Sequence, residues 1–394
     1  MNQTPAIPVY LDNHATTRVD PRVVEAMLPY FSEYYGNAGS VGHCFGEDAS
    51  VAVEQARTSI ALNLGADPKE IVFTSGATES NNLAIRGVAE RKRRRGNHLI
   101  SVRTEHQSVL QPLARLAKRD FHVTLLEVEP YTSPRAGCLD PQLVADSLTD
   151  DTALVSVMLA NNEIGVLQPL TEIAEICHRH DVLLHCDATQ AVGKVPIDLQ
   201  QVNPDLMSFT AHKIYGPKGV GALYIRRSVR LEPQIIGGGQ QQGRRSGTLN
   251  TPGIVGFAKA LELCASELPT ELVRLANLRN RLWQGLSERL GDLQLCGPTL
   301  ELPARLPGNL NLALGNVDGE ALLLNLKNLA ISSGATCAST DPGPSHVLLA
   351  LGMSEDLARS SLRFGLGRFN TEEDVDFAIQ NISEAAILLR KMAP

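Results

Sequence analysis

Short apolar runs alternate with amphipathic stretches from about residue 50 to residue 230. Stretches such as residues 170–180 have the spacing of a helix and separate several of these runs. Seven apolar runs are predicted as buried strands: 71–74, 99–102, 123–126, 153–158, 182–185, 206–209 and 220–225. Continuous apolar runs separated by helices are typical of a mostly parallel sheet that is covered on both faces. The pattern therefore predicts an α/β fold, in which a mostly parallel seven-stranded sheet is sandwiched by helices.

The pattern changes after about residue 254. A leucine stripe at three- and four-residue spacing predicts one long helix, and its members are Leu272, Leu275, Leu278, Leu282, Leu286 and Leu290. Beyond this helix, residues 309–314 and 361–364 are predicted as strands and residues 319–326 as a helix. A last helix is predicted to begin at residues 371–374, which nearly match a capping box. This part of the chain indicates a smaller α+β domain.

The length of 394 residues exceeds what one hydrophobic core usually spans, so two domains are expected. We place the large domain at residues 16–262, and assign residues 1–15 and 263–394 to the small domain. A charged content of 20% is that of a soluble enzyme, and the net charge of −7 argues against nucleic acid or an anionic membrane as a partner. No secretory signal is visible, and no apolar run approaches the roughly 20 residues of a membrane span. A cytoplasmic location is therefore expected.

The seven cysteines include no C-x-x-C pair, and their odd number predicts at least one free thiol rather than a disulfide framework. Cys337 lies among small, polar and turn-forming residues, so its surroundings allow either a reactive nucleophile or a plain exposed thiol. The other six are interpreted as packing residues: Cys44, Cys138, Cys177, Cys186, Cys264 and Cys296. Because no second ligand pair accompanies residues 177–180 or 185–186, no metal site is predicted.

Lys213 and Asp187 each follow a predicted strand. An amine at a strand end can condense with an aldehyde, and a carboxylate beside a pyridine nitrogen favours the protonated ring. Together they describe a pyridoxal phosphate (PLP) site, and Gln190 would then lie near the ring's phenolic oxygen as a donor. The alternatives are ordinary ones, because lysines near strand ends are common and most lone aspartates are exposed, capping or paired.

Three further segments fit a PLP site but also have simpler explanations. Residues 73–80 form a strand, a glycine turn and a helix start, a place that binds phosphate or is merely N-capped. His106 follows the strand at 99–102 and either stacks on the cofactor ring, carries a proton, or is structural. The glycine-rich loop at 237–249 is either a linker or reaches a phosphate in its own or a neighbouring subunit.

Several segments of the chain resemble those of the cysteine desulfurases, the NifS/IscS-like group of the class V, fold-type-I PLP enzymes. The similarity extends over nearly the whole length. The segments that carry it are 10–17, 75–80, 161–165, 187–190, 211–213, 245–248, 332–334 with Cys337, and 363–369. One departure is His14, which stands where other residues are usual, and no role is assigned to it.

The resemblance implies a role for each matching residue. Lys213 would be the Schiff-base lysine, Asp187 the partner of the pyridinium nitrogen, and His106 a catalytic residue over the ring. Arg363 would hold the substrate's carboxylate, and Cys337, in a loop at about 330–345, would form the persulfide. The remaining implied cofactor contacts are Ala77, Thr78, Asn162 (which would also contact the substrate), Gln190, Thr210, His212, and Thr248 from the partner subunit of a homodimer.

The implied reaction converts L-cysteine to L-alanine and leaves the sulfur on the enzyme as a persulfide. The sulfur would serve iron–sulfur cluster or thio-cofactor biosynthesis, by transfer to an acceptor such as an iron–sulfur scaffold protein. The rival functions are a selenocysteine lyase or a cyst(e)ine C–S lyase on the same scaffold, which differ in products or in selenium preference. A third is a PLP-holding sulfur carrier whose main role is partner binding.

Overall fold

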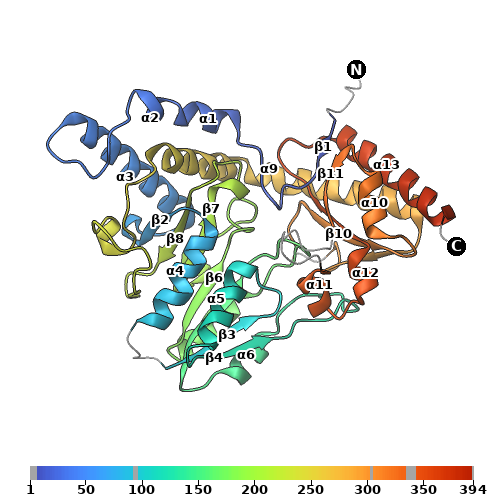
Figure 1. The fold of residues 1–394 in the computed structure, drawn as a ribbon, viewed down its shortest axis with the longest axis horizontal. Coiled ribbons are helices and arrows are strands. Elements are labelled where there is room, and N and C mark those ends of the chain that lie inside the picture. The colour runs from blue at the N-terminus through green and yellow to red at the C-terminus, as the bar shows by residue number, and fades with distance from the viewer. Residues whose placement is uncertain (1–6, 92–95, 302–304, 334–342, 393–394) are drawn as a thin grey trace.

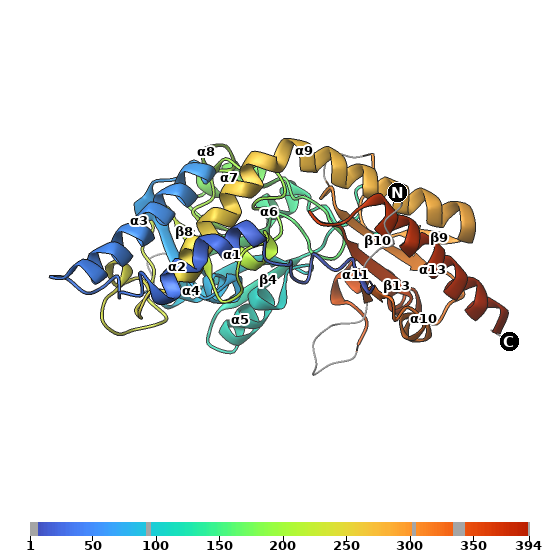
Figure 2. The same cartoon turned by 90° about the horizontal axis from the view of Figure 1, so that it is seen from above.

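The computed structural model describes residues 7–91, 96–301, 305–333 and 343–392. Two bodies of unequal size lie side by side, and the long helix α9 (Thr251–Leu290) runs from one to the other (Figures 1 and 2). Among the described helices, none is both long and apolar enough to cross a bilayer.

A seven-stranded sheet forms the centre of the large body, as predicted. Its strands in spatial order are β2 (Ile71–Thr74), β8 (Gly221–Ile225), β7 (Leu206–Thr210), β6 (Leu183–Asp187), β5 (Thr152–Met158), β3 (His98–Val102) and β4 (His122–Leu126). Only β8 runs in the opposite direction to the other six strands. The ends of the seven strands differ from the predicted ends by at most two residues. The fold class is therefore confirmed.

Alternate residues of each strand face opposite sides of the sheet, and helices cover both sides. Phe73 and Phe209 face one core, which also holds Ile60 and Phe257. The helices on this face are α1 (Pro21–Met27), α3 (Cys44–Leu64), α6 (Pro141–Ser147), α7 (Leu170–Arg179) and the first half of α9. Val72 faces the other core, which is covered by α4 (Ala77–Glu90) and α5 (Gln107–Ala117). The short helices are α2 (Pro29–Ser32), α8 (Leu199–Val202), η1 (Pro68–Glu70), η2 (Ala211–Lys213) and η3 (Gln241–Gly243).

The small body contains an antiparallel sheet in the order β12 (Ser332–Ser333), β13 (Ser361–Gly365), β10 (Asn309–Leu314) and β9 (Leu293–Leu295). A short parallel pair, β1 (Val9–Tyr10) and β11 (Leu329–Ala330), lies beside it. The helices here are α10 (Gly319–Asn325), α11 (His346–Ala350), α12 (Glu355–Arg359) and α13 (Glu372–Met392). Thr371 and Asp374 exchange the two hydrogen bonds of a capping box, as the sequence predicted.

Helix α9 belongs to both hydrophobic cores. Its residues up to Cys264 pack in the core of the large body, and from Leu275 onward its buried leucines pack in the core of the small body. Val9 and Leu11 near the N-terminus also pack in the small body's core. The boundary at residue 262 stays a prediction, because the helix continues unbroken through this region.

Candidate active site

A cavity of about 830 Å³ lies at the carboxyl ends of the parallel strands, where open α/β sheets bind their ligands. Its lining includes ten of the residues that the sequence singled out: Ala77, Thr78, His106, Asn162, Asp187, Gln190, Thr210, His212, Lys213 and Arg363. Nine of them end or follow strands of the large body, and Arg363 alone comes from β13 of the small body. The fold therefore brings these residues together, while their individual roles stay predictions.

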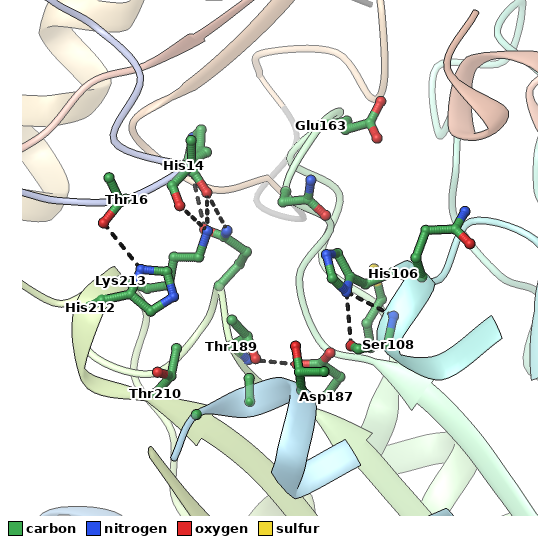
Figure 3. A pocket seen from close by; sticks show the side chains of 18 of the residues that line it. His14, Thr16, His106, Ser108, Glu163, Asp187, Thr189, Thr210, His212 and Lys213 are labelled. Atoms are coloured by element: carbon green, nitrogen blue, oxygen red, sulfur yellow. Dashed lines mark hydrogen bonds between the residues drawn. The ribbon is translucent and has the colours of Figure 1, made fainter. Parts of the chain in front are cut away.

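Lys213 ends η2, directly after β7, and its side chain reaches into the cavity (Figure 3). Its Nζ donates hydrogen bonds to the main-chain oxygens of His14 and, at 2.6 Å, of Ala15. Burial, followed by the positive charge of Arg363, lowers the pKa of Lys213 to about 8. More of the amine is then uncharged near neutral pH than in an exposed lysine, so Lys213 is more reactive toward an aldehyde.

The N-terminus of α4 forms one end of the cavity. Gly76, its N-cap, has a φ of +154°, and Gly221 on β8 lies so close that an added Cβ would meet the Cα of Gly76 at 2.7 Å. Glycine at both positions lets the first N–H groups of α4 face the cavity. Thr210 and His212 also line the cavity, and burial lowers the pKa of His212 to about 4, so its ring is neutral. This arrangement suits an anionic group such as phosphate.

A chain of hydrogen bonds joins Asp187 to His106 through Asn81 of α4 and Ser108 of α5. Asn81 Nδ2 donates to Asp187 Oδ2 at 2.7 Å and to Ser108 Oγ at 2.8 Å. Ser108 Oγ lies 2.8 Å from His106 Nδ1, and the Ser108 main-chain N–H donates to the same nitrogen at 3.0 Å. Because a backbone N–H can only donate, Nδ1 is an acceptor and the neutral ring carries its hydrogen on Nε2. Burial lowers the pKa of His106, which favours this neutral form.

Glu105 and Glu163 add two carboxyl groups to the lining. Glu105 is fully buried, accepts a hydrogen bond from the Met158 N–H at 2.6 Å, and has its pKa raised well above the usual range by burial. Glu163 accepts a hydrogen bond from Ser345, which caps α11. His346 follows Ser345 and donates from Nε2 to the Glu105 carbonyl at 2.9 Å. These contacts join the small body to the rim of the cavity.

Arg363 and Gln190 are oriented by partners of their own. Arg363 Nη2 donates to Asp12 Oδ1 and to Ser332 Oγ, each at 2.9 Å, and its Nε has no partner among the described residues. Gln190 Nε2 donates to the His14 carbonyl at 2.8 Å, and Gln190 Oε1 accepts from Lys194 Nζ at 2.6 Å. The free Nε of Arg363 suits a ligand carboxylate.

Three expectations from the sequence concern residues outside the described lining of the cavity. Thr248 is exposed and does not line the cavity of its own chain. Cys337 lies outside the described residues. The interpretation of Cys44 as a packing residue is wrong, because this thiol is exposed at the start of α3, where the first turn leaves it open to solvent. The other cysteines that were interpreted as packing residues are buried.

Comparisons with known proteins address the family directly. The profile of the family "Aminotransferase class-V" matches residues 9–377. Proteins called "Cysteine desulfurase IscS" from Anaeromyxobacter dehalogenans (strain 2CP-C) and Methylococcus capsulatus are 53% and 50% identical to this chain over 390 residues. These alignments cover 98% of this chain and 95% and 94% of those proteins. The chain belongs to the cysteine desulfurases of the class-V aminotransferase family.

Solved structures agree with this family membership. A structure titled "NIFS-LIKE PROTEIN" superposes with a TM-score of 0.89 at 39% identity, covering 97% of this chain and all 100% of that one. Another, titled "SspA in complex with cysteine", has a TM-score of 0.78 at 36% identity and covers 92% and 99% of the two chains. The family depends on PLP, so the fit of this cavity to PLP can be judged from its donors.

The donor set fits PLP at three points. The N-terminus of α4 offers N–H groups to the phosphate, Lys213 offers an amine with a lowered pKa to the aldehyde, and Asp187 offers a buried carboxylate to the ring nitrogen. Burial of Asp187 is compensated by the donors Asn81 and the Thr189 N–H. Thr189 Oγ1 is buried without a partner in the described structure, as expected beside a ligand.

Sequence reasoning missed the residues that position Asp187 and His106. Asn81 lies inside α4 and Ser108 in the first turn of α5, where polar residues are common. The sequence offers one signal for Ser108, which is that it lies two residues after His106. Glu105 could have been noticed as an acid within a buried turn next to His106.

Proposed function

We propose that this protein is a PLP-dependent cysteine desulfurase that converts L-cysteine to L-alanine and retains the sulfur as a persulfide on Cys337. The observation that carries the proposal is the cavity in which Lys213, Asp187 and Arg363 meet. They match an aldehyde cofactor, its ring nitrogen and an amino-acid carboxylate, respectively. The names of the relatives and the cysteine complex of the structural neighbour support L-cysteine as the substrate.

Each group of residues in the cavity has its own role in this proposal. Arg363 binds the carboxylate and so orients the substrate, and the α4 N-terminus with Thr210 and His212 holds the phosphate of the cofactor. When bound, PLP supplies an electron sink for the carbon skeleton of the substrate. Asp187 favours the protonated ring nitrogen on which that sink depends. His106, with its hydrogen on Nε2, donates toward the cavity.

The sulfur transfer balances without an external oxidant or reductant. The thiolate of Cys337 attacks the substrate sulfur, and the bond between that sulfur and the substrate's Cβ breaks. The electron pair of this bond stays with the carbon skeleton, which takes up a proton to become alanine. The proton that the Cys337 thiol lost can return through a donor such as His106. The sum is L-cysteine plus a thiol giving L-alanine plus a persulfide.

Mass spectrometry after treatment with L-cysteine tests this proposal. We expect one added sulfur on the Cys337 peptide and an equivalent amount of alanine. The variant Cys337→Ser should lose both products. The matched control Cys44→Ser removes an exposed thiol and should change neither. Pyruvate and ammonia in place of alanine would refute the proposal in favour of a C–S lyase.

We also infer a homodimer in which Thr248 reaches the cofactor of the partner subunit. Thr248 is exposed although the loop that carries it is fixed, since Arg245 pairs with Glu79 at 2.8 Å and Gln241 bonds to Phe73. Large apolar side chains are exposed around α1, α2, the start of α3 and this loop, a patch that a second copy would cover. They are Leu28, Phe31, Tyr34, Tyr35, Val41, Phe45 and Ile236.

Light scattering of the purified protein tests the dimer. Phe31→Asp places a charge in the apolar patch and should raise the fraction of monomer. Leu324→Asp is the matched control, because Leu324 is as exposed but lies on α10 of the small body. Equal mass for both variants, together with a monomeric parent protein, would contradict the dimer.

The sulfur is proposed to pass to an acceptor protein, such as an iron–sulfur scaffold, in the cytoplasm. The name IscS of the relatives supports this pathway. Pull-down of the persulfide form with candidate acceptors, followed by mass measurement of the acceptor, tests it. Sulfide release to a reductant with no transfer to any acceptor would contradict it.

A further inference from the structure

His14 lies at the cavity without a role in the steps above. It follows the first strand of the small body, and its main-chain oxygen accepts hydrogen bonds from Lys213 and Gln190 (Figure 3). His14 is 3% exposed, and its side chain packs so closely on β13 that a Cβ at Gly365 would lie 2.9 Å from its Cδ2. The His14 ring is therefore fixed between Lys213 and the strand that carries Arg363.

The hydrogen bonds of Gln190 determine which ring nitrogen of His14 carries the hydrogen. Gln190 Nε2 donates to the His14 carbonyl, so the other end of the amide is its oxygen. That oxygen accepts from Lys194 at 2.6 Å and lies 3.2 Å from His14 Nδ1. Because an amide oxygen only accepts, Nδ1 bears the hydrogen and Nε2 bears a lone pair. Nε2 is buried and finds no partner within the described part of the chain.

The groups that face His14 are mostly cationic. Lys194 from the segment after β6, Lys213 from η2 and Arg363 from β13 all disfavour a charged ring, and burial is the largest cause of a pKa well below the usual value. The nearby carboxylates have other partners, since Asp12 pairs with Arg363 and Asp187 with Asn81. His14 is thus a neutral acceptor in a region that repels further positive charge.

We propose that Nε2 of His14 accepts a hydrogen bond from the α-amino group of the substrate and thereby selects its uncharged form. An α-amino acid carries its amine one carbon from its carboxylate, so a substrate held by Arg363 places its amine toward Lys213 and His14. An ammonium there would lie near Lys194 and Arg363 and would be repelled. An uncharged amine is the form that can react with a carbonyl carbon. This inference rests on the proposed function and assigns His14 a share in substrate recognition.

Two ligands that differ in the amine separate this role from a general packing role. L-Alanine has the amine and no sulfur, whereas 3-mercaptopropionate has the sulfur and no amine, and both keep the carboxylate. The holoenzyme variant His14→Phe keeps a ring of similar size but has no acceptor. Calorimetry should show L-alanine binding weakened about three- to tenfold, as expected for one hydrogen bond, and 3-mercaptopropionate binding unchanged. His14→Gln, which can present an oxygen, should recover part of the loss.

Equal weakening of both ligands, or unchanged binding of L-alanine, would overturn the role of His14. If the phenylalanine variant does not fold, His14→Ala takes its place in the same two titrations. The same two outcomes then overturn the role of His14. Failure of the proposed function is a different result, namely no persulfide on Cys337 of the parent enzyme.

Discussion

Replacing Arg363 with lysine tests how the carboxylate of the substrate is held. The side chain of Arg363 is largely buried, and Asp12 and Ser332 fix its orientation through Nη2. The partnerless Nε belongs to the part of the guanidinium that remains for a ligand. Lysine keeps the positive charge but loses the planar fork that matches a carboxylate at two points.

The size of the effect follows from one lost hydrogen bond to a charged group. Such a bond contributes about 1.5–3 kcal/mol, which corresponds to a roughly 10- to 150-fold lower kcat/KM. The carboxylate keeps its charge throughout the reaction, so the loss removes binding that is equal in the ground state and the transition state. We therefore expect a higher KM for L-cysteine at a nearly unchanged kcat.

Steady-state formation of alanine from L-cysteine measures both constants. The inhibition constant of 3-mercaptopropionate should weaken by a similar factor for Arg363→Lys, because this ligand shares the carboxylate. Arg281→Lys is a suitable control, since Arg281 pairs with Asp376 on the surface, away from the cavity. An unchanged KM, or a loss confined to kcat, would refute the assignment of Arg363 to the carboxylate.

Three further predictions concern the cofactor end of the cavity. In stopped-flow absorbance, the rate of PLP uptake by apoenzyme should rise with pH, reach half of its maximum near the pKa of Lys213, which is about 8, and level off above it; a half-maximum near the roughly 10 of a free lysine would contradict it. A mixed dimer of one Lys213→Ala subunit and one Thr248→Ala subunit should contain one intact site, which binds PLP with the parent's affinity. If Thr248 instead contacts the cofactor of its own subunit, both sites of the mixed dimer are impaired. Gly221→Ala should weaken PLP binding at least about tenfold in a fluorescence titration, because the added Cβ displaces the Gly76 backbone. An affinity like that of the parent would contradict a phosphate site at the N-terminus of α4.

Much of the site could be predicted because it is built at strand ends. Buried parallel strands give continuous apolar runs, and their carboxyl ends meet at one edge of the sheet. Lys213, Asp187 and His106 each come within a few residues of such a run, so their convergence followed from the strand assignments. These residues could be recognised from the residues next to them in the sequence, without knowledge of any long-range contact.

The supporting contacts could not be predicted, because they join residues that are far apart in the chain. Asn81 meets Asp187 across 106 positions, and Lys213 meets His14 across 199. Neither Asn81 nor His14 has a local pattern that distinguishes it from an ordinary polar residue in a helix or turn. The exposure of Thr248 shows another limit, since a residue proposed to serve a second copy would have its partner outside its own chain.

The short N-terminal segment 12–15 contacts both Arg363 and Lys213, the residues proposed to recognise the substrate's carboxylate and amine. Asp12 orients Arg363 on the small body, whereas the carbonyl oxygens of His14 and Ala15 hold the amine of Lys213 on the large body. Asn13 N–H donates to the Gly365 carbonyl at 3.0 Å, which fixes the segment to β13 itself. One piece of backbone therefore holds both Arg363 and Lys213 in place. A shift of either body would have to move this segment, so its contacts constrain the spacing that an α-amino acid must match.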